Sequence, residues 1–177
     1  MKKRAIILSG NLVQDHEFIY PFYRLLEDGF AVDVCLNEGK PVKGILGTDI
    51  PPNKNHPVKD VGSINTKDYD LLIIPGGVKA LEKVRQNKGI INFISKFHEE
   101  DKLIACICSG AQLLISAKIV KGKKISGYYS MKDDIENAGA IYTDLPAVID
   151  KNIVTTAHYK DLGPWMKAAL NLYYKKN

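Results

Sequence analysis

The strongest constraint on the fold of this chain is its alternation of short apolar runs with segments of helical periodicity. Because strands that alternate with helices form parallel sheets covered on both faces, this pattern predicts the α/β class. The apolar runs predict buried strands at residues 4–8, 30–36, 71–74, 103–107 and 153–156. Apolar residues at helical spacing predict helices at residues 15–26, 90–97, 110–119, 131–138 and 165–174.

Length and composition favour one folded unit. The 177 residues suit a single domain spanning residues 1–177, and a chain of this size buries about 70% of the surface that it exposes when unfolded. With 45% hydrophobic and 25% charged residues, the composition is that of a globular protein. Residues 39–60 are rich in Gly, Pro, Asn and Lys, which predicts a hairpin or another excursion without a long element.

Charge, cysteine content and the first residues bear on partners and location. The formal net charge of +5 comes with scattered lysines, which indicates a solvated basic surface rather than a nucleic-acid site. The apolar run after the basic residues 1–4 is too short for a signal peptide, and no run approaches the ~18 apolar residues of a membrane span. We therefore expect a cytoplasmic protein with no membrane or nucleic-acid partner. The odd, sparse set of cysteines predicts free thiols at Cys35, Cys106 and Cys108.

A candidate nucleophile follows the predicted strand at residues 103–107. That strand runs directly into Cys108-Ser109-Gly110 and then into a predicted helix, which is similar to a nucleophile elbow although the Gly-x-Ser-x-Gly form is absent. We expect the helix start to stabilise a Cys108 thiolate through its free N–H groups and its dipole. The alternative is a buried structural cysteine, which is the interpretation that we favour for Cys106 inside the strand.

Two further turns reach the same edge of the predicted sheet, where open α/β sheets carry their chemistry. Gly76 and Gly77 follow the strand at 71–74, and their N–H groups could bind an oxyanion, although two glycines also suit an ordinary turn. Glu17 lies near the start of the helix at 15–26. It is either an ordinary helix-start acid or a proton carrier that points at Cys108, and a proton carrier there should have a raised pKa.

The histidines show no metal-site pattern. None of the four has metal-ligand spacing with another histidine or with a cysteine, so we expect no metal. His158 follows the predicted strand at 153–156 and could reach the same sheet edge as a base for Cys108. The alternative is a histidine that packs against its neighbours or lies on the surface.

Taken together, these segments resemble the ThiJ/PfpI superfamily, and above all its PfpI branch. The resemblance runs nearly from end to end, with the motifs in the family's order. Residues 15–21 resemble the family's E-D-x-E-L-x-Y-P segment, residues 74–77 its P-G-G turn, and residues 107–112 its I-C-H-G-P-Q elbow. Residues 132–139 resemble its K-D-D…N-A-G signature, and residues 161–166 match its end helix.

The resemblance implies a flavodoxin-like three-layer sandwich of the kind found in class I glutamine amidotransferases. It also implies homodimers or larger oligomers, and chemistry that needs no metal or organic cofactor. In the family's pattern Cys108 takes the nucleophile role and Glu17 the proton-handling role. The backbone groups of Gly76, Gly77 and Ser109 take the oxyanion role.

One position departs from the PfpI pattern. Peptidase proposals for that branch place a histidine directly after the cysteine, paired with a glutamate from a neighbouring subunit, whereas this chain has Ser109 there. Glu82 stands where such a glutamate would be, but without that histidine it has nothing to orient and is otherwise a surface helix acid. A Cys-His-Glu triad therefore cannot be assembled from neighbouring positions, although His158 could substitute in space.

The residues of this chain that match the family's motifs favour a cysteine-dependent enzyme of glyoxalase III or deglycase type, acting on α-oxoaldehydes such as methylglyoxal. One alternative is an intracellular cysteine peptidase or amidase with a peptide substrate, against which Ser109 counts. Another is a redox sensor or chaperone in which Cys108 is oxidised to a sulfinate beside Glu17.

Overall fold

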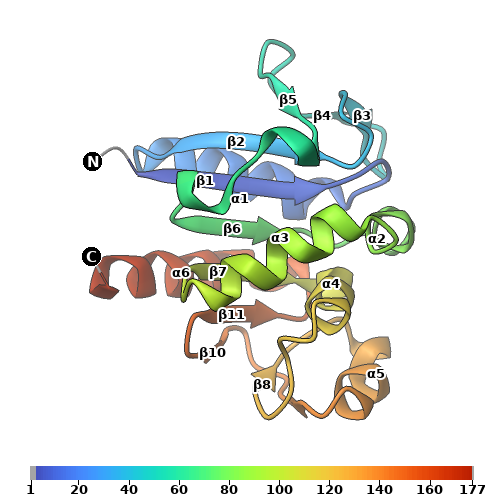
Figure 1. Cartoon of the computed structure of the whole chain (residues 1–177), viewed down its shortest axis with the longest axis vertical. Coiled ribbons are helices and arrows are strands. Elements are labelled where there is room, and N and C mark those ends of the chain that lie inside the picture. The colour runs from blue at the N-terminus through green and yellow to red at the C-terminus, as the bar shows by residue number, and fades with distance from the viewer. Residues whose placement is uncertain (1–2, 177) are drawn as a thin grey trace.

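The structure, a computed structural model, describes residues 3–176. Its centre is a seven-stranded sheet with the order β10-β11-β7-β6-β1-β2-β5 and helices on both faces (Figure 1). Within this sheet β10 pairs antiparallel with β11, and every other pair is parallel. The fold is therefore of the α/β class that the hydrophobic pattern predicted, and it is the flavodoxin-like sandwich that the family resemblance implied.

The central strands are short and apolar, as strands buried on both faces of a parallel sheet must be. The strands of the main sheet are β1 (Arg4–Ser9), β2 (Ala31–Leu36), β5 (Val58–Lys59), β6 (Leu71–Ile74), β7 (Leu103–Ile107), β10 (Val148–Asp150) and β11 (Ile153–Thr156). Two small additional sheets pair β3 (Val42–Lys43) with β4 (Asp49–Ile50) and β8 (Lys124–Ile125) with β9 (Ile141–Tyr142).

The helices form the two outer layers. On one face, α1 (Asp15–Glu27) contacts β1 and β2, and α6 (Leu162–Lys176) packs on β7 and β11 and touches α1. On the other face, α3 (Lys88–Glu99) packs on β7 and contacts α4 (Ala111–Ser116) (Figure 1). The short α2 (Val78–Val84) contacts β1 and α4 on that same side. A further short helix, beyond this layer, is α5 (Lys132–Asn137), which contacts β9.

The predicted elements are present, but some of their ends differ. The helix predicted at residues 110–119 is shorter, because a 3₁₀ turn, η3 (Cys108–Gly110), precedes α4 and because Lys118 has a positive φ of 58° just beyond its end. The last helix is longer than predicted and begins at Leu162. The pattern did not predict α2 or β10, since elements of seven and three residues carry too little periodicity to detect.

Residues 39–60 form the predicted excursion, and Asp15 holds it against the start of α1. The buried Asp15 carboxylate accepts hydrogen bonds from the backbone N–H groups of Leu46 (2.8 Å) and Thr48 (3.1 Å), in the loop between β3 and β4. A Cβ atom at Gly44 would lie 2.3 Å from this carboxylate, so only glycine fits. The hairpin is therefore fixed relative to α1, and β5 then adds an edge strand beside β2.

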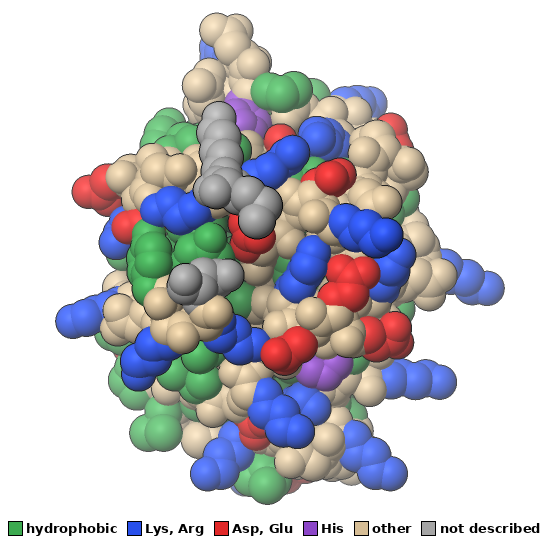
Figure 2. All heavy atoms as spheres, turned by 60° about the vertical axis from the view of Figure 1, so that its left-hand side comes forward, with side chains coloured by type: hydrophobic (Ala, Val, Ile, Leu, Met, Phe, Trp, Pro, Cys, Tyr) green, Lys and Arg blue, Asp and Glu red, His purple; other side chains and the backbone are tan. Residues whose placement is uncertain are grey.

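The surface carries both signs of charge over an apolar core. On the face shown in Figure 2, Lys and Arg side chains are interleaved with Asp and Glu and form no single basic area. In the core, the indole N–H of the fully buried Trp165 donates to the carbonyl oxygen of Val154 at 3.2 Å. From residue 3 to residue 176, no helix is both long and apolar enough to cross a bilayer.

Candidate active site

Three turns converge at the carboxyl ends of the central strands. From β1 the chain continues to β2 on one side and later returns to β6 on the other, so the strand order reverses between β1 and β6. Open α/β sheets bind ligands at such a switch point. Glu17 comes from the helix after β1, Gly76 from the turn after β6, and Cys108 from the turn after β7.

Cys108 occupies a strained turn. Its φ of 60° lies in the left-handed region, where a side chain costs about 1–2 kcal/mol. Close packing holds the turn: a Cβ atom at Gly110 would lie 2.8 Å from both the sulfur of Cys106 and the carbonyl oxygen of Ile74. The backbone N–H of Tyr128 donates to the carbonyl oxygen of Cys108 at 3.1 Å. The Cys108 side chain is consequently half-buried at the sheet edge, whereas Cys106 stays in the core, as predicted.

Glu17 and Cys108 meet at Gly76. The backbone N–H of Gly76 donates to Oε2 of Glu17 at 2.7 Å. A Cβ atom on Gly76 would lie 2.5 Å from that oxygen and 2.7 Å from the Cβ of Cys108, so the contact requires glycine. This corrects the oxyanion role predicted for Gly76, because its single N–H is already bonded to Glu17. The N–H of Gly77 has no hydrogen-bond partner in the described part of the chain.

Glu17 is a buried acid with one unpartnered oxygen. Burial raises the pKa of its carboxyl to about 7, against the hydrogen bond from Gly76 and the interaction with Cys108. Its Oε1 atom has no hydrogen-bond partner within residues 3–176. Since a bare carboxylate oxygen is costly to bury, a proton belongs on this carboxyl for part of the neutral pH range. The raised pKa matches the one that the sequence predicted for a proton carrier.

The Cys108 thiol is harder to ionise than the sequence predicted. Burial raises its pKa to about 12 and the charge of Glu17 adds to this, while the N–H and hydroxyl groups of Ser109 lower it. Ser109, which lies in the 3₁₀ turn before α4, therefore favours the thiolate, but burial and Glu17 outweigh it. Between pH values of about 7 and about 12 the two groups together hold one proton, and this proton belongs to the pair rather than to either residue.

Cys108 opens into a cavity of about 420 Å³. Of the site residues that the sequence predicted, Gly77, Cys108, Ser109 and His158 line it, whereas Gly76 and Glu17 do not and contact Cys108 from the protein interior. The full lining consists of Gln14, Ile45, Gly77, Val78, Cys108, Ser109, Gln112, Tyr128, Ser130, Met131, His158 and Tyr159.

His158 is held in this cavity by a backbone contact. Its Nδ1 accepts a hydrogen bond from the N–H of Lys160 at 3.2 Å, which caps the 3₁₀ turn η5 (Tyr159–Asp161). A neutral imidazole that accepts at Nδ1 carries its proton on Nε2. In this tautomer Nε2 of His158 carries the ring proton and is a hydrogen-bond donor, not an acceptor.

The structure separates Glu82 from the site and adds residues that sequence analysis missed. Glu82 is exposed on α2 and does not line the cavity. Gln14 lines it and caps α1, accepting from the N–H of Glu17 at 3.3 Å. The sequence could have identified Gln112 as a site residue, since it belongs to the elbow motif at residues 107–112. Tyr128 and Tyr159 had no such signal, because they stand outside every motif and reach the cavity only through the fold.

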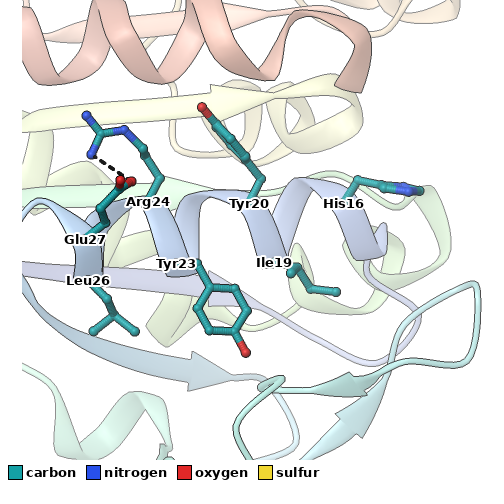
Figure 3. Close-up of a pocket in the computed structure, with 7 residues that line it drawn as sticks. All are labelled: His16, Ile19, Tyr20, Tyr23, Arg24, Leu26 and Glu27. Atoms are coloured by element: carbon teal, nitrogen blue, oxygen red, sulfur yellow. Dashed lines mark ion pairs between the residues drawn. The ribbon is translucent and has the colours of Figure 1, made fainter.

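A larger hollow of about 690 Å³ lies on the exposed side of α1 (Figure 3). Within it Arg24 pairs with Glu27 at 3.7 Å, and Tyr20 and Tyr23 point to different sides of the helix. This hollow contains no cysteine and is lined by one helix, so the candidate chemistry lies in the smaller cavity at Cys108. The lining residues are His16, Ile19, Tyr20, Tyr23, Arg24, Leu26 and Glu27.

Known proteins match this chain over nearly its whole length. The sequence matches the DJ-1/PfpI family over residues 3–172. The chain belongs to this family. It is 35% identical over 169 residues to the "Deglycase PfpI" of Pyrococcus furiosus, covering 96% of this chain and 98% of that protein. It is 34% identical over 173 residues to the "Putative cysteine protease YraA" of Bacillus subtilis, covering 97% of this chain and 99% of that protein.

A solved structure extends the comparison to three dimensions. It is a two-domain protein from Anabaena variabilis with DJ-1/ThiJ/PfpI-like and ferritin-like domains. The match has a TM-score of 0.87 and 32% identity, and it covers 96% of this chain and 48% of that one. The DJ-1/PfpI family of this chain thus includes proteins named as deglycases and as a cysteine protease, which indicates enzymatic activity in the family.

Proposed function

We propose that this protein is a cysteine-dependent enzyme of glyoxalase or deglycase type, which acts on α-oxoaldehydes such as methylglyoxal or on their adducts. The observation that carries the proposal is the meeting of Cys108 and the buried Glu17 at Gly76. This pair combines a nucleophile with one mobile proton, as carbonyl chemistry at a cysteine requires. Relatives named deglycases support an enzymatic activity of the deglycase type.

The first proposed step is addition to the aldehyde. The Cys108 sulfur attacks the aldehyde carbon of methylglyoxal, a C–S bond forms, and the proton of the pair moves to the former carbonyl oxygen. The product is a hemithioacetal. The N–H groups of Gly77 and Ser109 belong to residues that line the cavity beside Cys108, and they are the candidate donors to this oxygen.

The next steps move a proton between carbons. Glu17 takes the proton from the carbon that bears sulfur, which leaves an enediolate, and returns a proton to the neighbouring carbon. The hydroxyl proton passes from the first oxygen to the second, and the product is a lactoyl thioester. Water then cleaves the C–S bond and releases lactate and the Cys108 thiol, so that one methylglyoxal and one water yield one lactic acid. A carboxyl with a pKa of about 7 suits a group that both takes and gives a proton near neutral pH.

Hydrolysis of peptides or amides is the second candidate. It is favoured by His158, which lines the same cavity as Cys108, and by the relative named as a cysteine protease. A cysteine protease needs a histidine that accepts the thiol proton. Because Nδ1 of His158 accepts from Lys160, the ring would first have to change its tautomer, so this candidate ranks below the first.

Methylglyoxal consumption and lactate formation test the proposal. We expect lactate from the wild-type protein, none above background from Cys108→Ala, and a loss of about 100-fold or more in Glu17→Gln. Cys35→Ala is the matched control, because Cys35 is buried in β2, and it should retain activity. Circular dichroism of each variant would establish that it is folded.

Either of two results would overturn the proposal. One is lactate formation by Cys108→Ala at the wild-type rate, and the other is no lactate from the wild-type protein. In the second case a Cys108-dependent burst on peptide or amide substrates would identify the hydrolase. Oxidation of Cys108 by mild peroxide, seen by mass spectrometry without turnover, would identify a redox sensor.

A further inference from the structure

The cavity at Cys108 is larger than the simplest substrate needs. A molecule as small as methylglyoxal takes about 150 Å³ even if each of its carbon and oxygen atoms is given the ~30 Å³ of a water molecule in the liquid. The cavity holds about 420 Å³, within the range of sites that bind larger organic ligands. Room therefore remains for a second group attached to the carbonyl.

Aromatic rings form part of the wall around this room. The centroid of the His158 ring lies 4.0 Å from that of Tyr159 and 6.2 Å from that of Tyr128. The His16 ring also stacks on Tyr159, with 5.3 Å between the ring centroids and an interplanar angle of 29°. Tyr128 and Tyr159 are 39% and 44% exposed, so these stacked rings still offer surface to a ligand. We call Tyr128, His158 and Tyr159 the aromatic wall.

The charge of the lining limits which group can occupy it. No Asp, Glu, Lys or Arg side chain appears among the described residues that line the cavity. Its polar groups are uncharged amides, hydroxyls and backbone N–H groups together with His158 and the thiol of Cys108. An anion would therefore find no fixed cation in the lining. A cation would find no lining carboxylate, because Glu17 contacts Cys108 from the protein interior. Flat, uncharged rings pack on such aromatic surfaces in offset or edge-to-face arrangements.

We propose, on the basis of the function proposed above, that the aromatic wall selects α-oxoaldehydes whose second carbonyl carries a flat, uncharged ring. Phenylglyoxal represents this class. Its aldehyde carbon forms the bond to Cys108 while its phenyl ring packs on Tyr128 and Tyr159. The stoichiometry is the same as for methylglyoxal: one phenylglyoxal and one water give one mandelic acid, and the Cys108 thiol is regenerated.

Binding of unreactive analogues tests the wall independently of catalysis. Acetophenone and cyclohexyl methyl ketone have a similar size, but only acetophenone carries a flat ring, and benzamidine is flat and positively charged. In ligand-observed NMR titrations of the wild-type protein, we expect acetophenone to bind about three- to tenfold more tightly than each of the others. Tyr159→Leu and Tyr128→Leu should remove the preference over cyclohexyl methyl ketone, whereas Tyr159→Phe, which retains a ring, should keep it.

Turnover gives the second measurement. The ratio of kcat/KM for phenylglyoxal to kcat/KM for cyclohexylglyoxal should fall about three- to tenfold in Tyr159→Leu and stay at the wild-type value in Tyr159→Phe. A ratio between variants cancels the intrinsic reactivity of the two aldehydes. Tyr23→Leu is the matched control, since Tyr23 is an exposed tyrosine on α1 outside the cavity, and its ratio should not change.

The outcomes separate this inference from the proposed function. If acetophenone and cyclohexyl methyl ketone bind alike, or if Tyr159→Leu keeps the preference, the aromatic wall does not select flat rings, whether or not methylglyoxal is converted. Tighter binding of benzamidine would overturn the assignment to uncharged groups. If acetophenone is preferred through Tyr128 and Tyr159 but no aldehyde is turned over, the binding site stands and the proposed reaction fails.

Discussion

The carboxyl groups of Asp33 and Glu17 have pKa values that the fold shifts in opposite directions. Asp33 on β2 accepts from the guanidinium of Arg4 (2.9 Å), the ammonium of Lys59 (3.0 Å) and the hydroxyl of Tyr69 (2.9 Å). Burial acts to raise its pKa, but these partners outweigh burial and hold that pKa below its ordinary value. Glu17 has one backbone N–H and the Cys108 thiol, and burial raises its pKa to about 7.

The difference separates a structural charge from a reactive one. Asp33 stabilises the folded state because Arg4, Lys59 and Tyr69 donate hydrogen bonds to its negative charge. Glu17 weakens the folded state above its unfolded pKa, because the fold buries its charge without enough donors. Glu17 therefore lowers stability, and it contacts Cys108, whose backbone is strained. Buried charges and backbone strain of this kind are typical of functional sites.

Of the substitutions that test this difference, Glu17→Gln should change the free energy of unfolding the most. The unfolded carboxyl has the ordinary glutamate pKa of 4.5, whereas the pKa of the folded one is about 7. The wild-type free energy of unfolding therefore falls as the pH rises through this window. The amide cannot ionise. The variant should therefore be more stable by about 3 kcal/mol at about pH 8, and by less than about 1 kcal/mol at about pH 5.

Urea unfolding of the wild type and Glu17→Gln at both pH values would measure this gain. Glu27→Gln is the control, because it removes the same charge from an exposed position on the same helix and should show little pH-dependent gain. Equal stability of Glu17→Gln and the wild type near pH 8 would mean that Glu17 is not destabilised by burial.

Asp33→Asn should have the opposite sign and a smaller size. The variant leaves Arg4 and Lys59 without their carboxylate, so we expect a loss of about 1–2 kcal/mol near neutral pH. Since the folded pKa of Asp33 is lowered, its contribution is present above the unfolded pKa and is lost as the pH falls through the folded one. The two proteins should therefore converge in acid.

The measurement is again urea unfolding against pH. Asp144→Asn, at an exposed loop position, is the control for loss of one negative charge. A gain in stability for Asp33→Asn near neutral pH would contradict the distinction between the two carboxyls.

The smallest expected effect concerns the strain at Cys108. Because its φ is 60°, Cys108→Gly should be more stable than Cys108→Ala by about 1 kcal/mol. At Cys106, which lies in the extended strand β7, the same pair of substitutions should have the reverse order, with glycine less stable. Chemical denaturation of the four variants would compare the two sites. The same order at both would show that the turn at Cys108 stores no strain.

Much of the fold could be predicted because its signals are local. The apolar runs before Pro75 and Cys108 are long enough to predict β6 and β7, and parallel strands with helical connections leave few other architectures. The candidate nucleophile was also predictable, since a buried strand that ends in Cys108-Ser109-Gly110 predicts an elbow. The resemblance to a family then suggested that Glu17 would be its partner.

The geometry of the site was not predictable, because it depends on which strands become neighbours. The sequence did not show that the N–H of Gly76 would be bonded to Glu17, that burial would outweigh the helix start at Cys108, or that Tyr128 and Tyr159 would line the cavity. Each of these depends on contacts between segments far apart in the chain.

The sequence by itself determined the α/β class, the position of the candidate nucleophile and the glycines that let the backbone turn, because hydrophobic periodicity and local sterics act over a few residues. Only the tertiary structure decided how Glu17 and Cys108 share a proton, which N–H remains free for a ligand and which rings surround it. Burial and hydrogen-bond partners set those properties, and both exist only once β1, β6 and β7 lie side by side.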